Sequence, residues 1–212
     1  MDQESYKVVL LGESGVGKTS IITQFIDETF LEDQQSTNGA TFSTKMVTCS
    51  NGKQIKFDIW DTAGQEKYRA LTKMFYKDAA AAILVYDITR QESFNELKTY
   101  WAEQIKENSP KKIVLGVAAN KSDLLEQEAV DEGEARAFAK EMNAIFNATS
   151  AKNQSGVEDL FVSIANKLND PTWEVGKEAE NEKKKIDRIK QGTMKLKNQE
   201  DKKEPNQKKG CC

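Results

Sequence analysis

The sequence predicts an α/β fold with a doubly wound, mostly parallel six-stranded sheet that contains one antiparallel strand. Residues 80–86 and 112–119 are nearly continuous apolar runs, as expected for parallel strands that helices cover on both faces. Strand-like and helix-like patterns alternate along the chain, which predicts crossover connections. Asn51-Gly52 separates two strand-like runs and favours the tight turn of an antiparallel hairpin.

The first half of the chain follows the order strand, helix, strand, strand. Residues 6–11 form an apolar run that ends at Gly12, and apolar side chains recur at helical spacing after Lys18. Residues 42–49 and 54–60 lie on either side of the predicted turn. In the second of these runs apolar and polar side chains alternate, as in a strand with one buried face.

The second half adds helices in alternation with strands. Residues 92–108 carry apolar side chains at helical spacing and stop before Pro110, a residue that interrupts helices. Residues 130–142 and 157–168 predict two further helices, with a short strand at 144–148 between them. The complete order is therefore β-α-β-β-α-β-α-β-α-β-α.

Length and composition predict one domain, residues 1–169, followed by a flexible basic tail, residues 170–212. Residues 183–212 contain eleven Lys or Arg and four Asp or Glu, a net +7, so the rest of a chain of total charge −3 is near −10. A basic tail on an acidic body favours an anionic membrane surface over nucleic acid. The start of the chain does not resemble a secretory signal and no apolar run reaches ~20 residues, so we expect a cytosolic protein.

The chain has no histidine and only three cysteines, Cys49, Cys211 and Cys212. The absence of histidine excludes His-based catalytic triads and His-ligated metal sites, and the cysteines do not form a disulfide framework. The chemistry must therefore use backbone amides, Lys, Thr, Gln and Asp side chains, and a bound metal.

Residues 12–19, Gly-Glu-Ser-Gly-Val-Gly-Lys-Thr, match the phosphate-binding pattern G-x-x-x-x-G-K-[ST] between a predicted strand and a predicted helix. In such a loop, backbone N–H groups and the helix N-terminus hold the phosphates. Lys18 supplies a charge to the β- and γ-phosphates, and Thr19 an oxygen to Mg²⁺. The predicted phosphate-binding residues are Ser14, Gly15, Val16, Gly17, Lys18, Thr19 and Ser20.

Asn120-Lys121-Ser122-Asp123 follow the predicted strand 112–119, at the carboxyl end where α/β sheets bind ligands. The Asp123 carboxylate can accept hydrogen bonds from both N1–H and N2–H₂ of guanine. Adenine has no such donor pair and would leave the carboxylate unpaired. Behind a complete phosphate loop, this motif predicts a guanine nucleotide.

These motifs resemble those of the Ras superfamily, and of its Rab family in particular, over residues 6–169. The similarity includes a second-switch motif at residues 61–65 (Asp-Thr-Ala-Gly-Gln), the guanine-contacting loop Ser150-Ala151-Lys152, and Phe30, which precedes Thr37 by seven residues like the family's base-stacking aromatic. Rab-like signatures stand at residues 56–60, 67–69, 75–79 and 84–89.

The resemblance implies a P-loop GTPase fold and a GTP/GDP switch that hydrolyses GTP slowly without an activating protein. Gly64 is expected to donate its N–H to the γ-phosphate, and Gln65 to orient the attacking water. The implied catalytic residues are Lys18, Thr37, Gly64 and Gln65. The implied Mg²⁺ ligands are Thr19, Thr37 and Asp61, the last through water.

Cys211 and Cys212 resemble the double-cysteine ending of Rabs, on which both thiols receive geranylgeranyl groups. Two lipids anchor a protein stably, whereas one does so marginally. The implied partners are a guanine nucleotide exchange factor, a GTPase-activating protein, a GDP-dissociation inhibitor, a Rab escort protein with geranylgeranyl transferase, and membrane-traffic effectors. Gly39-Ala40 and residues 67–71 resemble the early-endosomal branch, which implies the cytoplasmic face of an endosomal membrane.

Two other functions stay open from sequence. One is a scaffold that binds nucleotide without hydrolysing it. The other is a P-loop nucleotide kinase, which the guanine motif and the lack of an arginine-rich lid disfavour. Phe42, Trp60 and Phe75 are either core residues or, as the resemblance implies, a partner surface. Asn38 replaces the Ile or Val usual in Rabs, which predicts altered effector choice without loss of nucleotide binding.

Overall fold

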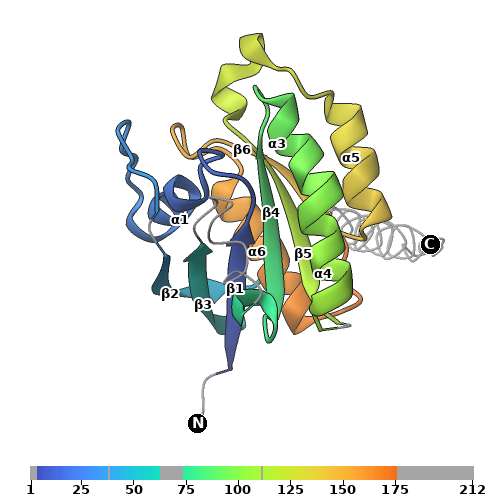
Figure 1. The fold of residues 1–212 in the computed structure, drawn as a ribbon. Helices are drawn as coiled ribbons and strands as arrows, with labels where there is room; N and C mark the ends of the chain where they lie inside the picture. Colours follow the sequence, from blue (N-terminus) through green and yellow to red (C-terminus); the bar gives the residue numbers. More distant parts are fainter. Residues whose placement is uncertain (1–3, 38, 63–73, 111, 176–212) are drawn as a thin grey trace, which may run out of the picture. The chain divides into compact units, whose positions relative to one another are not determined.

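The computed structural model describes residues 4–37, 39–62, 74–110 and 112–175 (Figure 1). The chain divides into two units, residues 1–172 and 173–212, and all the elements below belong to the first. The strands are β1 (Ser5–Leu11), β2 (Ala40–Thr48), β3 (Gln54–Thr62), β4 (Ala81–Asp87), β5 (Val114–Asn120) and β6 (Ile145–Thr149). The helices are α1 (Lys18–Asp27), α3 (Gln91–Glu96), α4 (Ala102–Asn108), α5 (Glu132–Glu141) and α6 (Val157–Asn169).

The six strands form one sheet in the order β2-β3-β1-β4-β5-β6. Only the pairing of β2 with β3 is antiparallel, and the other pairs are parallel. The hairpin turns at Gly52, whose φ is +83° and whose N–H donates to the Cys49 carbonyl oxygen (2.8 Å). The predicted fold class, including its single antiparallel strand, is confirmed.

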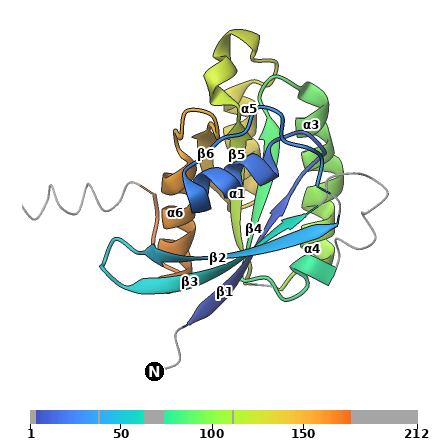
Figure 2. The same ribbon diagram turned by 90° about the vertical axis from the view of Figure 1, so that its left-hand side faces the viewer.

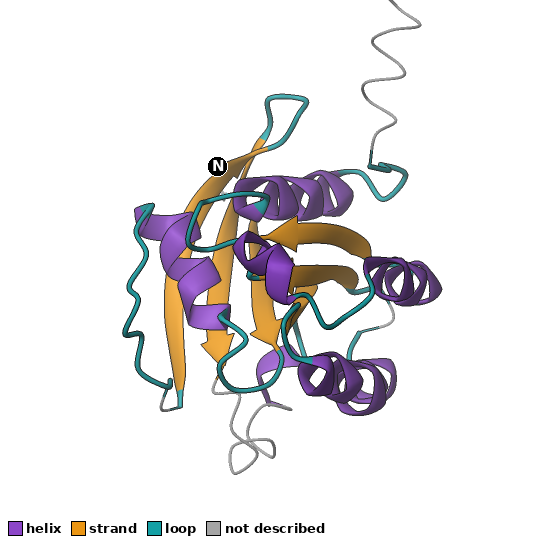
Figure 3. Ribbon diagram, turned by 90° about the horizontal axis from the view of Figure 1, so that it is seen from above, coloured by secondary structure: helices purple, strands orange, loops and turns teal. Residues whose placement is uncertain are grey.

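Helices cover both faces of the sheet, as predicted from its apolar strands (Figure 3). Figure 2 shows α6 and α4 on opposite sides of it. On the α4 side, Val9 and Leu11 of β1 belong to a buried cluster that includes Phe94 and Trp101. On the other side, Phe25 of α1 stacks on a phenylalanine of α6 with the ring centroids 3.8 Å apart.

Two helices differ in detail from the sequence prediction. The helix predicted at 92–108 contains a π-helical turn, Leu97–Trp101, between α3 and α4. The helix predicted from residue 130 begins later because Asp131 is its N-cap and accepts a hydrogen bond from the Glu134 N–H (2.7 Å). A 3-10 helix at Ser122–Gln127 was not predicted.

The strand register places the functional loops side by side. Asp87, Asn120 and Thr149 end β4, β5 and β6, and they are register partners in the sheet. Because these strands and β1 are parallel, the loops that follow them all emerge at the same edge. Within the described ranges, no helix combines the length and apolar character that crossing a bilayer requires.

Candidate nucleotide-binding site

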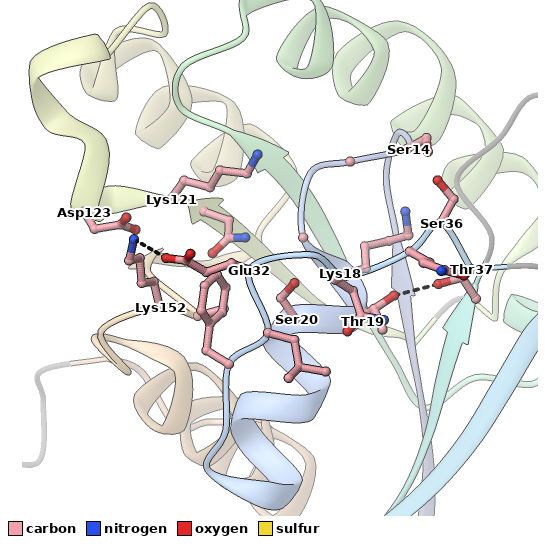
Figure 4. A pocket seen from close by; sticks show the side chains of 18 of the residues that line it. Ser14, Lys18, Thr19, Ser20, Glu32, Ser36, Thr37, Lys121, Asp123 and Lys152 are labelled. Atoms are coloured by element: carbon pink, nitrogen blue, oxygen red, sulfur yellow. Dashed lines mark hydrogen bonds and ion pairs between the residues drawn. The ribbon is translucent and has the colours of Figure 1, made fainter.

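A cavity of about 400 Å³ lies at this edge of the sheet, within the size range of small-molecule sites (Figure 4). Its wall comes from the phosphate loop after β1, the segment between α1 and β2, and the loops after β5 and β6. The predicted nucleotide-binding residues that line it are Ser14, Gly15, Gly17, Lys18, Thr19, Ser20, Phe30, Thr37, Asn120, Lys121, Asp123, Ala151 and Lys152.

Val16 and Ser150 were also predicted to bind nucleotide, through the backbone N–H groups of their loops, and that prediction is compatible with their side chains, which are buried and are not among the residues that line the cavity. The Val16 carbonyl oxygen accepts a hydrogen bond from Asn120 Nδ2 (2.8 Å). The Ser150 hydroxyl donates to Asp123 Oδ1 (2.5 Å). Both residues therefore support the side chains that face the cavity.

Asn120 connects the phosphate loop to the two base loops. Besides its bond to Val16, its side-chain oxygen accepts from the Thr149 hydroxyl (3.2 Å), and all three groups are buried. Gly17 passes so close that a Cβ atom there would lie 2.3 Å from Asn120 Nδ2, and its φ is +95°. Only glycine fits this approach, so the second glycine of the motif has a packing role as well as a conformational one.

Lys18 is buried at the start of α1, and its ammonium group donates to the carbonyl oxygens of Gly12 and Glu13 (both 2.9 Å). Burial lowers the pKa of Lys18 to about 8, although Asp61 and Glu13 act in the opposite direction. A desolvated ammonium ion gains from an anion beside it. The phosphate groups of a nucleotide in this cavity are suitable anions.

Three oxygen-bearing side chains meet next to Lys18. The hydroxyls of Thr19 and Thr37 lie 2.7 Å apart, and they donate to Asp61 Oδ2 at 2.7 and 3.1 Å. Asp61 Oδ1 is buried and makes no hydrogen bond within the described structure. Burial raises the pKa of Asp61, and the hydrogen bonds from the threonines offset this only in part.

This oxygen cluster fits a hard divalent cation. Mg²⁺ prefers oxygen ligands and is usually held by one or two carboxylates together with substrate phosphates. In the described ranges no group of three or more acidic, His or Cys side chains forms a metal site of its own. Asp61 with two hydroxyls is therefore suited to Mg²⁺ that arrives with a nucleotide.

The opposite end of the cavity carries the base motif. Ser150 accepts from the Asn153 N–H (3.2 Å) and donates to Asp123, which fixes the carboxylate at the wall. Lys121 has a left-handed backbone conformation (φ 68°), and its ammonium group pairs with Asp87 Oδ2 at 2.7 Å. The site thus holds a carboxylate at one end and a phosphate loop at the other.

Comparison with known proteins agrees with this arrangement. The family model described as Ras family matches residues 7–170. The chain belongs to the Ras family. It is 45% identical to the Ras-related protein Rab-22A of Homo sapiens over 162 residues, which are 76% of this chain and 82% of that protein. The Rab-22A proteins of Canis lupus familiaris and Mus musculus show the same identity and coverage. The chain is thus a Rab GTPase, a GTP/GDP switch of vesicle trafficking.

In this Ras-family chain the segment between Phe30 and Thr37 forms an exposed wall of the cavity. Glu32 pairs across the opening with Lys152 (3.1 Å), and both side chains are exposed. The lining residues missed by the sequence interpretation are Leu31, Glu32, Gln34, Gln35, Ser36, Thr62 and Leu124. Most of them lie between Phe30 and Thr37, which were both expected to reach the nucleotide. Their position between these two residues could have predicted that they line the cavity.

The three aromatic residues of the Rab-like signatures differ in burial, and their role as a partner surface stays a prediction. The ring centroid of Trp60 lies 5.2 Å from that of Phe42 and 5.4 Å from that of Phe75. Phe42 is 54% exposed, whereas Trp60 and Phe75 are half-buried and pack against the core cluster. The exposed ring of Phe42 therefore packs against Trp60, which in turn packs against Phe75, and these last two side chains are partly buried.

Several predicted residues lie outside the described ranges. They are Asn38, Gly64, Gln65, Cys211 and Cys212, together with the Rab-like signature at 67–69 and the run 67–71 that resembles the early-endosomal branch. Their roles remain predictions from sequence.

Proposed function

We propose that this chain binds GTP or GDP with Mg²⁺ in the described cavity and works as a switch on the cytoplasmic face of an endosomal membrane. The observation that carries the proposal is that Asp123 and a complete phosphate loop line the same cavity. The buried side chain of Asn120 ties the two ends together. A ligand with a guanine at one end and phosphates at the other matches this arrangement.

Asp123 selects the base by accepting hydrogen bonds from N1–H and N2–H₂ of guanine. The bond from Ser150 supports this role because it holds the carboxylate before the ligand arrives. Phe30, Ala151 and Lys152 line the same cavity. Phe30 would stack on the base, and the loop containing Ala151 and Lys152 would give a backbone N–H to O6. Adenine leaves the Asp123 carboxylate unpaired, which sites of this kind reject by a factor of roughly 10⁴–10⁵.

Lys18, Thr19, Thr37 and Asp61 hold the phosphate end. Lys18, which here donates to two loop carbonyls, would donate to phosphate oxygens of the bound nucleotide. Thr19 and Thr37, which here donate to Asp61, would hold Mg²⁺ through their hydroxyl oxygens, and Asp61 would do so through water. When bound there, Mg²⁺ would supply positive charge that neutralises the charge developing on the phosphate oxygens.

Hydrolysis further requires Gly64 and Gln65. Gly64 donates its N–H to the γ-phosphate, and Gln65 orients the attacking water. Loss of the γ-phosphate releases the second switch and Thr37, so the partner surface changes with the nucleotide.

The tail supplies the membrane anchor through two geranylgeranyl groups on Cys211 and Cys212. An escort protein presents the chain to the transferase, and a GDP-dissociation inhibitor extracts the GDP form. An exchange factor and a GTPase-activating protein drive the cycle, and membrane-traffic effectors bind the GTP form. The 45% identity to Rab-22A proteins over most of the domain supports this Rab-type cycle.

The nucleotide copurifying with the full-length protein tests the central claim. We expect about one mole of GDP or GTP per mole of protein and strong preference for GTP over ATP. The Asp123→Asn variant should lose GTP affinity and gain affinity for xanthosine triphosphate, because its amide complements xanthine better than guanine. Equal affinity of the wild-type protein for ATP and GTP would contradict the proposal.

Single-turnover hydrolysis separates a cycling GTPase from a binding-only scaffold. We expect slow release of phosphate from bound GTP and slower release by Gln65→Leu. If Gln65→Leu matches the wild-type rate with and without an activating protein, the assigned role of Gln65 is wrong.

The membrane anchor is tested in cells. Replacing Cys211 and Cys212 by Ser should move a tagged chain from endosomal membranes to the cytosol with unchanged GDP affinity. Persistent membrane association of this variant would show that the basic tail or a partner suffices.

A further inference from the structure

Arg90 lies beside the phosphate loop, although it belongs to none of the nucleotide-binding motifs. Its backbone is held on both sides in the turn between β4 and α3. The Arg90 N–H donates to the Asp87 carbonyl oxygen (3.0 Å), and its carbonyl oxygen accepts from the N–H (3.1 Å) and the hydroxyl (2.7 Å) of Ser93, which is fully buried. These hydrogen bonds fix the position of the Arg90 backbone, from which its side chain extends.

The guanidinium group of Arg90 reaches the loop. Nη2 donates to the Ser14 carbonyl oxygen (3.0 Å) and lies 3.4 Å from Glu13 Oε2, while Nε lies 3.5 Å from Asp87 Oδ2. The buried atoms Glu13 Oε2 and Arg90 Nε make no hydrogen bond within the described structure, so these two carboxylate contacts are ion pairs only. The hydrogen bond to Ser14 is the contact by which Arg90 holds the loop backbone.

That hydrogen bond orients the next residue. The Ser14 carbonyl and the Gly15 N–H belong to one planar trans peptide and point in opposite directions. Ser14 and Gly15 line the cavity, whereas Arg90 does not. Holding the carbonyl oxygen toward Arg90 therefore turns the Gly15 N–H away from Arg90, toward the cavity side of the loop.

The surroundings of Gly15 restrain this peptide little. Its φ is +78°, and a Cβ atom built there would meet no atom within 4 Å. A glycine in open space rotates easily. Without the bond from Arg90, the peptide could turn its carbonyl oxygen toward a phosphate, and two negatively polarised groups would then face each other.

Asp87 holds Arg90 by an ion pair and also contacts Lys121 of the base motif. Its side chain is 2% exposed, its Oδ2 pairs with Lys121 Nζ (2.7 Å), and its Oδ1 accepts from the N–H (2.9 Å) and hydroxyl (2.7 Å) of Thr89. Burial acts to raise the pKa of Asp87, but the hydrogen bonds from Lys121 and Thr89 outweigh it and lower the pKa. The carboxylate is ionised at neutral pH and keeps the guanidinium group paired.

We propose that Arg90 is a positioning residue that turns the Gly15 N–H toward the phosphates of the bound nucleotide and thereby slows nucleotide release. The inference rests on the nucleotide-binding function proposed above. Arg90 acts from behind the loop through its backbone, unlike an arginine that contacts the γ-phosphate itself. It also links the phosphate loop to Lys121 of the base motif through their shared partner Asp87.

The test measures the release of fluorescent GDP from full-length wild-type protein, Arg90→Ala, Arg90→Lys and a control, Arg136→Ala. Arg136 pairs with Glu132 on the exposed face of α5. Loss of one charge-assisted hydrogen bond should accelerate release from Arg90→Ala about tenfold. Arg90→Lys keeps the charge but lacks the planar fork, so its release should be intermediate. Arg136→Ala should stay within twofold of wild type.

Two readouts separate loop positioning from a general structural effect. In competition assays Arg90→Ala should lose more affinity for GDP than for GMP, because GMP has fewer phosphates for the loop to hold. In the GDP complex, hydrogen exchange at the Gly15 amide should become about tenfold faster, while exchange in the core strand β5 stays unchanged.

Several outcomes would overturn the inference. One is GDP release at the wild-type rate from Arg90→Ala or from Arg90→Lys. Another is an equal loss of affinity for GDP and GMP in Arg90→Ala, which would place the effect in the loop that binds the base. If Arg90→Ala does not fold, the Arg90→Lys measurements decide. If the wild-type protein does not bind GDP at all, the proposed function fails instead.

Discussion

The two walls of the nucleotide cavity differ in burial and in the number of ties to the core. Lys18 and Asn120 on the inner wall, and Thr149 and Ser150 directly behind it, are at most 5% exposed, and Asn120 bonds to both neighbouring loops. Residues 31–36 of the outer wall are all exposed. The outer wall is tied to the rest of the site by Thr37 at the oxygen cluster and by Glu32 at Lys152.

This difference explains how one site can bind a nucleotide tightly while part of its wall changes conformation with the nucleotide. Buried, hydrogen-bonded segments open only at a high cost in free energy, whereas exposed segments with few ties rearrange at a low cost. We infer that the inner wall sets nucleotide affinity. The outer wall reports which nucleotide is bound, because it can change without disturbing the core.

The largest expected effect comes from breaking the inner wall with Asn120→Ala. This change leaves the Val16 carbonyl and the Thr149 hydroxyl without their partner, and an unsatisfied buried polar group costs about 1–3 kcal/mol. We expect GDP affinity to fall about 100-fold in a calorimetric titration. Asn95→Ala, which removes an exposed asparagine bonded to Gln91, is the control and should bind GDP normally. Normal GDP affinity of Asn120→Ala would remove the distinction between the walls.

An intermediate effect is expected from Thr37→Ala, which cuts the outer wall from the oxygen cluster. Affinity for a non-hydrolysable GTP analogue with Mg²⁺ should fall about tenfold, the usual result of losing a hydrogen bond to a charged group. GDP affinity should change less than threefold, because loss of the γ-phosphate is proposed to release Thr37 from the site. Thr44→Ala, at an exposed position of β2, is the control. Equal losses for both nucleotides would make Thr37 part of the inner wall.

The smallest effect is expected from Glu32→Gln, which breaks the ion pair across the opening. Glu32 and Lys152 have 75% and 56% exposed side chains, and exposed ion pairs contribute little. GDP release should accelerate by at most about fivefold, and added salt should accelerate release from wild type more than from the variant. The double reversal Glu32→Lys with Lys152→Glu should restore slow release. Glu4→Gln breaks a comparable exposed pair with Lys53 and should have no effect, because these residues stand just before β1 and β3 and the cavity lies at the other ends of these strands. If the GDP release rate is the same in wild type, in Glu32→Gln and in the charge-reversed double variant, the ion pair at Glu32 does not restrain the outer wall.

The sequence supported the fold prediction because each element carries its own periodicity. Apolar runs marked β4 and β5, and Asn51-Gly52 marked the hairpin between β2 and β3. The π-helical turn in the middle of a predicted helix was missed, since the apolar spacing of residues 92–108 resembles that of an ordinary helix. The start of α5 was misplaced by two residues because Asp131, an N-cap, stands inside the apolar pattern.

The candidate site, like the fold, has parts that the sequence predicts and parts that it does not. By itself the sequence determined the phosphate loop and the guanine motif, because the groups these functions need stand within a few consecutive residues. Only the tertiary structure decided that Val16 and Ser150 support the wall from behind and that Arg90 holds Ser14. The bonds of Asn120 to Val16, Arg90 to Ser14 and Lys152 to Glu32 join residues 104, 76 and 120 positions apart. Such contacts depend on how β1, β4, β5 and β6 align in the sheet, and no local pattern in the chain specifies a partner at that separation.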